Sequence, residues 1–252
     1  MTQCRVIHAL MVREVIALYG RSGLGALWLA IEPLTFALPV LTLWSIVRAP
    51  FEHGIPLMPL LWSGYMPLLL FRHVGQRMLF FIRGNTGLLF HRNVTLLDIA
   101  LARCLVEIIQ NITAATILYG LFYIAGAIEA PRDPPMLLAG YLFMAWWSVA
   151  LGLIIGAMCE RSEWIEKAWQ PISYTYIFFG GTWYLADWLP PGLRTIALLQ
   201  PSAQSYEMIR AGVLGSRVVT HYDIGYTIFA LGVLTFAGLL ALRRGRQLVA
   251  IS

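Results

Sequence analysis

Apolar residues gather in six long stretches along the chain, and most of these stretches are long enough to cross a membrane as helices. The hydrocarbon core of a bilayer is about 30 Å thick, so a helix that rises about 1.5 Å per residue needs about 20 residues to cross it. Because backbone groups in lipid must be hydrogen-bonded within their own segment, such a segment is expected to be helical. The six predicted spans are residues 27–47, 57–82, 99–125, 136–158, 168–185 and 222–242. We therefore predict an all-α integral membrane protein.

Two further segments are apolar but are not predicted to span. Residues 1–26 are predicted to form an N-terminal interfacial helix, with a flexible break between Gly20 and Gly25 ahead of the first span. Residues 193–214 are long and apolar enough to resemble a seventh span, but Arg194, Pro201, Glu207 and Arg210 interrupt the run. Residues 186–221 are therefore predicted to form short re-entrant helices on the outer face. Spans one to five then occupy residues 27–185, and span six with a cytoplasmic tail occupies 222–252. The loops are short, so a single domain is predicted over residues 1–252.

The basic residues are distributed by membrane side. Ten of the 18 Lys and Arg residues fall on one side of this topology: Arg5, Arg13, Arg21, Arg83, Arg92, Arg161, Lys167, Arg243, Arg244 and Arg246. Five fall on the other side: Arg48, Arg132, Arg194, Arg210 and Arg217. Cytoplasmic loops carry an excess of Lys and Arg, so both termini are predicted to be cytoplasmic.

Composition and missing motifs narrow the function classes. Only 12% of residues are charged and 59% are apolar, whereas a soluble domain has roughly 25% charged residues. The net charge of +5 is explained by topology, so no nucleic-acid partner is predicted. The only lysine is Lys167, so the chain has no P-loop with which to bind ATP itself. No zinc-binding or serine-hydrolase motif occurs either, and we predict no metal, no cofactor and no catalytic residue in this chain.

Charged residues inside the predicted spans are the sharpest candidates for a substrate path. Arg72 and Arg77 fall in the second span, where a charge is costly unless it faces a cavity, a partner or the lipid headgroups. They are expected either to line a path for an anionic substrate or to form internal ion pairs, for example Arg72 with Glu107. Arg103 and Glu107 lie four residues apart in the third span, close enough to pair on one helix face. Glu32, beside the helix-bending Pro33, has the same two interpretations.

Aromatic and basic side chains supply the other candidates for this path. In the N-terminal region, Arg13, Tyr19, Arg21 and Trp28 are predicted either to form an inner-leaflet gate that meets phosphate or to anchor the helix at the headgroups. Aromatic rings offer apolar faces to a substrate, but they also belt membrane interfaces in most membrane proteins. The aromatic candidates are Trp44, Tyr65, Tyr174, Phe178, Trp183 and Tyr184. Tyr174 and Phe178 share one helix face while Tyr176 points elsewhere, so these rings are not expected to line one groove.

Three ordered segments resemble the signature of one known family. The first runs from Arg13-Glu14-Val15 to Glu32-Pro33, the second from Asn85-Thr86-Gly87 to Glu107, and the third from Gln200-Pro201 to Arg210. Together with six spans, they resemble the KpsM-like capsule polysaccharide export permeases, which are transmembrane subunits of type-two ABC exporters. The run Trp62-Ser63-Gly64-Tyr65 resembles the capsule-exporting branch more than the O-antigen branch.

The resemblance implies a function and a set of partners. It implies a homodimer with two copies of a separate KpsT-like ABC ATPase that binds ATP and Mg, in a bacterial inner membrane. It implies export of a lipid-linked acidic polysaccharide, handed to a periplasmic KpsE-like co-polymerase and an outer-membrane channel. The chain itself would be a permease and not an enzyme.

Two cytoplasmic loops are candidates for coupling to such an ATPase. Residues 84–98 combine helix-breaking glycines with an apolar knob and polar anchors, which suits a short helix that enters a cleft of the ATPase. The coupling candidates here are Leu88, Leu89, Phe90, His91 and Arg92, with Glu163 and Glu166 in a second loop. The alternative is that both loops are solvated and only set topology.

Other functions remain open from the residues alone. An O-antigen, teichoic acid, drug or lipid exporter of the same superfamily would have the same span pattern. An intramembrane acyltransferase would place His73 or His91 near a nucleophile in a sealed pocket. A secondary transporter would show a paired acidic network and a repeat between its halves, and neither is visible in the sequence.

Overall fold

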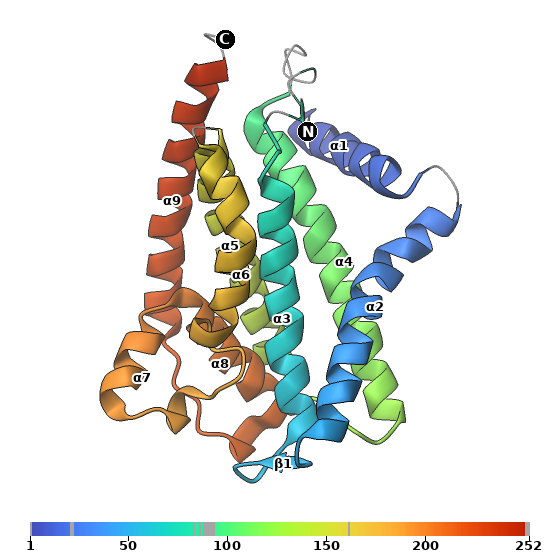
Figure 1. Ribbon diagram of the computed structural model, residues 1–252, viewed down its shortest axis with the longest axis vertical. Coiled ribbons are helices and arrows are strands. Elements are labelled where there is room, and N and C mark those ends of the chain that lie inside the picture. The colour runs from blue at the N-terminus through green and yellow to red at the C-terminus, as the bar shows by residue number, and fades with distance from the viewer. Residues whose placement is uncertain are drawn as a thin grey trace.

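The computed structural model describes residues 2–20, 23–82, 84–85, 87, 94–160 and 162–249, and these residues form a helical bundle (Figure 1). The long helices are α1 (Thr2–Tyr19), α2 (Gly23–Val47), α3 (Leu57–Met78), α4 (Leu96–Ile124), α5 (Pro134–Cys159), α6 (Glu163–Phe179) and α9 (Ile224–Val249). The shorter elements are β1 (Phe51–Glu52), β2 (Ile55–Pro56), η2 (Ala186–Trp188), α7 (Pro191–Leu198), α8 (Pro201–Leu214) and η3 (Gly215–Arg217).

The bundle has two distinct ends. Helix α1 and the last turns of α9 lie at one end, and the β1–β2 hairpin and α7 lie at the other (Figure 1). We call these the termini end and the hairpin end. The long helices α3, α4, α5 and α9 run between the two ends, whereas α1 lies across the termini end at an angle to them.

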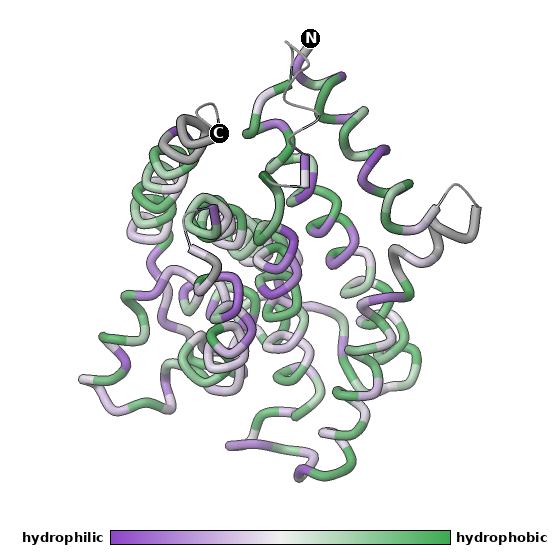
Figure 2. Tube along the Cα trace, turned by 45° about the horizontal axis from the view of Figure 1, so that its top comes forward, coloured by the Kyte–Doolittle hydropathy of each residue, from purple (hydrophilic) through white to green (hydrophobic). Residues whose placement is uncertain are grey.

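Three helices are long and apolar enough to cross a membrane, among the residues that the structure describes. They are α4, α5 and the Ile224–Arg243 part of α9. The apolar part of α2 is shorter, Ile31–Val47, while α3 carries His73, Arg72 and Arg77 in its last two turns. Figure 2 shows a similar contrast at the termini end, where hydrophobic residues predominate along α9 and hydrophilic positions recur along α1. The predicted third, fourth and sixth spans are therefore present as apolar helices.

Three of the predicted helix boundaries, in the second and fifth spans, are wrong. The second predicted span was expected to continue to residue 82, but α3 ends at Met78 and residues 79–82 form turns. The fifth was expected at 168–185, but α6 begins at Glu163 and ends at Phe179. Gly180 and Gly181 follow, and Gly181 has φ +88°, a conformation that glycine adopts without a steric cost. Trp183 and Tyr184 consequently lie in a loop and not in a helix.

The starts of α4 and α5 are fixed by side-chain caps. Thr95 accepts a hydrogen bond from the Asp98 amide, and the Asp98 carboxylate accepts one from the Thr95 amide, which is a complete capping box. Asp133 accepts from the Met136 amide, and Pro134 occupies the first turn of α5, where a missing N–H is tolerated. These caps explain why α4 and α5 begin two to three residues before the apolar periodicity suggests.

Helix α5 is packed unusually closely on three sides. A Cβ added at Gly140 would lie 2.7 Å from the backbone nitrogen of Ile209 in α8, and one at Gly156 would lie 2.8 Å from the Met78 carbonyl oxygen of α3. On α9, a Cβ at Gly238 would lie 3.1 Å from the Ala150 carbonyl oxygen of α5. Small residues at helix contacts are typical of membrane proteins, because they let backbones approach.

The hairpin between α2 and α3 was not predicted. Its strands pair antiparallel, and the turn residues His53 and Gly54 have φ +53° and +79°. Two positive φ angles define the type I′ turn that fits the twist of a two-residue hairpin. The hairpin connects α2 to α3 at the hairpin end.

Candidate functional site

A charged chamber lies beneath α1 at the termini end. It is a cavity of about 610 Å³ bounded by α1, α2, α3 and α4. Its polar lining residues are Arg13, Glu14, Glu32, His73, Gln76, Arg77, Asn85, Arg103 and Glu107. Three arginines and three glutamates therefore face one space, so the chamber carries both signs of charge, as expected if its charged residues form internal ion pairs.

Glu107 is the most buried charge in this chamber. Its side chain is 2% exposed, and Arg77 Nε lies 2.5 Å from its Oε1. The His73 ring nitrogen Nδ1 lies 3.8 Å from its other oxygen. The sequence offered Arg72 as the internal partner of Glu107, but Arg77 occupies that position. A buried carboxylate needs such a partner because desolvation of an unpaired charge is costly.

Arg103 pairs with α1 and not with its own helix. Its Nε lies 3.1 Å from Glu14 Oε1, and its Nη1 donates to the Arg77 carbonyl oxygen at 3.1 Å. The expected pair with Glu107 four residues along α4 does not form, because Glu107 is already engaged by α3. Arg103 thereby connects α1, α3 and α4.

Further hydrogen bonds hold α1 over the chamber. The Tyr19 hydroxyl contacts the Glu32 carboxylate of α2, and Gln110 Nε2 donates to the same carboxylate at 3.2 Å. Arg13 Nη1 donates to Asn85 Oδ1 at 3.0 Å, and among the described residues no carboxylate is paired with Arg13. Nearly all the contacts that close this chamber are therefore between side chains.

Arg72 lies on a different face of α3, beside α6. Its guanidinium carbon lies 3.9 Å from the centre of the Tyr174 ring, a cation–π geometry. Its Nε is buried without a hydrogen-bond partner, and no described carboxylate is within ion-pair distance. Two of the predicted path residues, Arg72 and Tyr174, thus meet, while Phe178, 73% exposed, lies one turn further along α6.

The remaining aromatic candidates separate into two groups. Near the hairpin, Trp44 and Trp183 have ring centres 5.7 Å apart, and the Arg48 guanidinium lies 4.6 Å from the Trp44 ring. Trp28 lies near the other end of α2 and is 53% exposed. The aromatic candidates therefore do not form one continuous path within a single chain.

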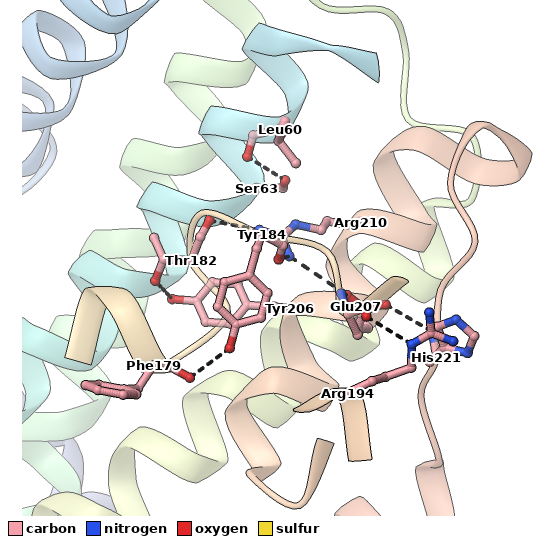
Figure 3. A network of polar contacts seen from close by, with 11 residues as sticks. Leu60, Ser63, Phe179, Thr182, Tyr184, Arg194, Tyr206, Glu207, Arg210 and His221 are labelled. Carbon is pink, nitrogen blue, oxygen red and sulfur yellow. Dashed lines mark hydrogen bonds and ion pairs between the residues drawn. The ribbon is translucent and has the colours of Figure 1, made fainter. Parts of the chain in front are cut away.

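A second charged cluster lies near the hairpin end, around α8 (Figure 3). Arg210 is completely buried and donates to the carbonyl oxygens of Tyr184 and Thr182, at 2.5 and 2.8 Å. Glu207 accepts from the amides of Ala186 and His221, at 3.1 and 3.0 Å. The two side chains are 3.9 Å apart. We call this the α8 cluster, and in it charged side chains bind mainly backbone groups.

The outermost loops at this end are held by exposed ion pairs. Arg217 Nη2 lies 2.8 Å from Glu129 Oε1, and Arg132 Nη2 lies 2.5 Å from the other Glu129 oxygen. The hydrogen bond from Arg217, followed by the charges of Arg217 and Arg132, lowers the pKa of Glu129 below its usual range. Asp187 similarly contacts Arg194 and His221, at 3.2 and 3.0 Å.

Comparison with known proteins identifies the family. The profile described as "ABC-2 type transporter" matches residues 5–214 of the chain. The chain belongs to this family. It is 34% identical to the capsule polysaccharide export inner-membrane protein CtrC of Neisseria meningitidis serogroup B, over 94% of this chain and 89% of the relative. It is 33% identical to the capsule polysaccharide export inner-membrane protein BexB of Haemophilus influenzae, over 96% and 91%. The polysialic acid transport protein KpsM of Escherichia coli is 23% identical over 96% and 93%.

The ABC-2 profile covers every residue that lines the charged chamber and both charged residues of the α8 cluster, Glu207 and Arg210. The resemblance to capsule export permeases noted in the sequence is confirmed by these relatives. The first two, which are the more similar, carry the name of capsule export, in agreement with the preferred branch.

Several predicted site residues lie outside the described part of this ABC-2 family chain. These are Arg21 and the coupling candidates Leu88, Leu89, Phe90, His91 and Arg92. Glu163 begins α6, but its side chain is not described, and Glu166 is half-buried in the first turn of α6. Their predicted roles stay predictions.

Sequence reasoning missed part of both charged sites. Asn85 and Gln110 were not candidates, and His73 was considered only for an acyltransferase, although all three complete contacts around the chamber. A signal was present for Asn85, because it belongs to the second motif that resembles the family. Arg210 and Glu207 were noticed as obstacles to a span and as part of the third motif that resembles the family, but their backbone partners cannot be identified from residue types.

Proposed function

We propose that this chain is the transmembrane subunit of an ATP-driven exporter that moves lipid-linked capsular polysaccharide from the cytoplasm across the inner membrane. The observation that carries the proposal is the similarity, over 94–96% of the chain, to relatives that are named for capsule polysaccharide export. ATP hydrolysis is assigned to a separate ATPase subunit with its own ATP and Mg. The chain then contributes a conduit and no covalent chemistry.

The proposed topology has six spans with both termini in the cytoplasm, so the termini end faces the cytoplasm. The three apolar helices and the excess of arginine on the termini side support this orientation. Helices α2, α3 and α6 complete the six. Their polar positions then face a second copy of the chain or an aqueous path, where a charge is less costly than in lipid. Helices α7 and α8 are the proposed re-entrant pair.

The charged chamber is the proposed entry site for the anionic linker between lipid and polymer. Arginine binds phosphate with a planar fork of donors, and Arg13 is the chamber arginine without a described carboxylate partner. Arg77 and Arg103 are paired within the chamber, and an entering phosphate would compete with Glu107 and Glu14 for them. Because α1 is held by side-chain contacts, exchange of these partners would also loosen the roof of the chamber.

The sugar path is proposed to continue along the Arg72–Tyr174 face and to the aromatic group at Trp44 and Trp183. The first of these groups is not enclosed within one chain, since Tyr174 and Phe178 are 53% and 73% exposed. A homodimer would enclose such a face between its two copies. Two ATPase subunits at the termini end, and a periplasmic co-polymerase with an outer-membrane channel beyond the hairpin end, complete the proposed assembly.

The test of function is a deletion with defined complementation. Removing the gene should leave polymer inside the cell, and the wild-type chain should restore it to the surface. A tagged chain should co-purify with a nucleotide-binding protein, and Phe90→Ala and Arg92→Ala should weaken that co-purification if residues 84–98 couple to it. Normal surface polymer in the deletion strain would refute the export proposal.

A matched pair of variants tests the chamber. Arg13→Ala removes the donor proposed to meet the linker and should lower surface polymer about tenfold, as expected for the loss of one charge-assisted hydrogen bond of about 1.5 kcal/mol. Arg5→Ala changes an exposed arginine on the same helix outside the chamber and should have no effect. Equal export by the two variants, at equal protein levels, would remove Arg13 from the path.

A further inference from the structure

An apolar groove runs between α4 and α5 near the hairpin end, separate from both charged sites. Its volume is about 430 Å³, within the range of about 300–1,000 Å³ typical of ligand pockets. Nearly all of its lining is apolar or aromatic. The residues on which the inference depends are Trp62, Ile112, Gly120, Tyr123, Pro134 and Tyr141.

Three aromatic rings line the deep side of the groove. The Trp62 ring of α3 lies 4.8 Å from Tyr119 and 5.9 Å from Tyr141, centre to centre. Trp62 Nε1 donates to the Ala115 carbonyl oxygen at 3.2 Å, and the Tyr119 hydroxyl donates to that of Glu129 at 2.7 Å. The Tyr141 hydroxyl, in contrast, is buried and has no hydrogen-bond partner. The rings are thus fixed in place around a space that they do not fill.

The length and position of the groove match one half of a membrane. Its α4 side extends from Ile112 to Tyr123, which is about 16 Å at a rise of about 1.5 Å per residue. Half of a hydrocarbon core is about 15 Å. Both helices that form the groove are apolar candidate spans, and Tyr123, 54% exposed, lies at the end of α4 where an amphipathic ring would meet the headgroups. The groove therefore begins at the membrane surface and ends near the bilayer midplane.

We propose that this groove binds one acyl chain of a bilayer phospholipid, from the leaflet at the hairpin end. A lipid-facing groove of this depth cannot remain empty without losing dispersion contacts along its walls, and its apolar lining offers water few partners. A flexible hydrocarbon chain of one leaflet fits both its length and its chemistry. The inference requires only that α4 and α5 cross the membrane, and it does not depend on what the protein exports.

Gly120 provides a variant that fills the groove without disturbing the helices. A Cβ at Gly120 meets nothing within 4 Å, so Gly120→Leu extends into the open space that Gly120 lines. Gly232→Leu is the matched control, because Gly232 in α9 also has nothing within 4 Å and does not line the groove. Thr116→Met is a second filling variant from the same wall.

The experiment uses the full permease, with any ATPase that co-purifies, in nanodiscs that contain a phosphatidylethanolamine with a diazirine on one acyl chain. After irradiation, labelled residues are mapped by mass spectrometry. In the wild-type protein, labelling of the groove residues of α4 and α5 should exceed labelling of exposed α9 residues by about tenfold, equivalent to about 1.4 kcal/mol of preference. Gly120→Leu and Thr116→Met should reduce it to the α9 level, and Gly232→Leu should leave it unchanged.

The opposite results would overturn the inference. Equal labelling of the groove and of α9 in the wild-type protein would show only bulk lipid contact. Groove labelling that persists in both filling variants would place the chain elsewhere. Absence of labelling on α4 and α5, with α9 still labelled, would show that a second copy or another subunit covers this face.

Discussion

The two charged sites of this chain are built on opposite principles. In the charged chamber at the termini end, side chains from α1, α2, α3 and α4 bind one another, as in the pairs Arg77–Glu107 and Arg103–Glu14. In the α8 cluster, Arg210 binds carbonyl oxygens and Glu207 binds amides. A side-chain pair can exchange partners when a competing ion arrives, whereas backbone groups stay where the fold places them. The chamber is therefore suited to rearrangement, and the α8 cluster is suited to holding a fixed shape.

Loss of Arg210 should have the largest effect on stability. Arg210→Met leaves Glu207 buried without its cation and two carbonyl oxygens without their donor, and removal of one partner of a buried pair costs about 3–5 kcal/mol. The midpoint of thermal unfolding in detergent measures this. Arg217→Met, also near the hairpin end but 41% exposed, should cost less than about 1 kcal/mol. Equal midpoints of thermal unfolding for the two variants would show that the α8 cluster does not stabilise the fold more than an exposed ion pair does.

The Arg77–Glu107 pair of the charged chamber should contribute less to stability than Arg210 does, and a double-mutant cycle can measure the coupling between its two side chains. Arg77→Ala should destabilise the protein by about 1–3 kcal/mol, because Glu107 loses its nearest donor. Arg77→Ala with Glu107→Ala should cost less than the sum of the single changes, with a coupling of about 0.5–3 kcal/mol. Additive effects in thermal unfolding would mean that the pair is not coupled.

Removal of a single hydroxyl group should loosen the attachment of α1 over the chamber. Tyr19→Phe removes one hydroxyl contact to Glu32 and should weaken the closure of α1 by about 0.5–1.5 kcal/mol, seen as faster hydrogen exchange of α1 amides. Tyr123→Phe is the control, because the exposed Tyr123 hydroxyl makes no hydrogen bond to a described residue. Identical exchange in both variants would separate Tyr19 from the closure of α1.

The smallest effect on stability is expected from protonation of Glu129 in the loop at the hairpin end. Because the folded pKa of Glu129 lies below its unfolded value of about 4.3, its ion pairs contribute fully above that pH and are lost as pH falls through the folded pKa. The protection of the loop before α5 against hydrogen exchange, measured relative to the intrinsic exchange rate at each pH, should therefore fall on acidification below about pH 4. Glu129→Gln should already exchange faster at neutral pH and lose this pH response. A Glu129→Gln variant with the wild-type profile would contradict the assignment.

The sequence predicted the apolar helices better than the contacts between them. Residues 99–125 and 136–158 are continuous apolar runs, and α4 and α5 follow them closely. The end of α6 was missed because Trp183 and Tyr184 are as apolar in a loop as in a helix, and only the φ of Gly181 separates the cases. Whether Arg72 or Arg77 meets Glu107 depends on how α3 is rotated against α4, which periodicity within either helix does not determine. The partners of Arg210 are backbone carbonyl groups. Because every residue carries such a group, the sequence does not indicate which ones Arg210 binds.

The close packing of α5 determines how force can pass through the chain. Glycines bring its backbone against α3, α8 and α9, and such contacts leave no room for sliding. A displacement of the Cys159 end of α5 would therefore be shared with the three helices packed against it and would reach the Asp133 end through them.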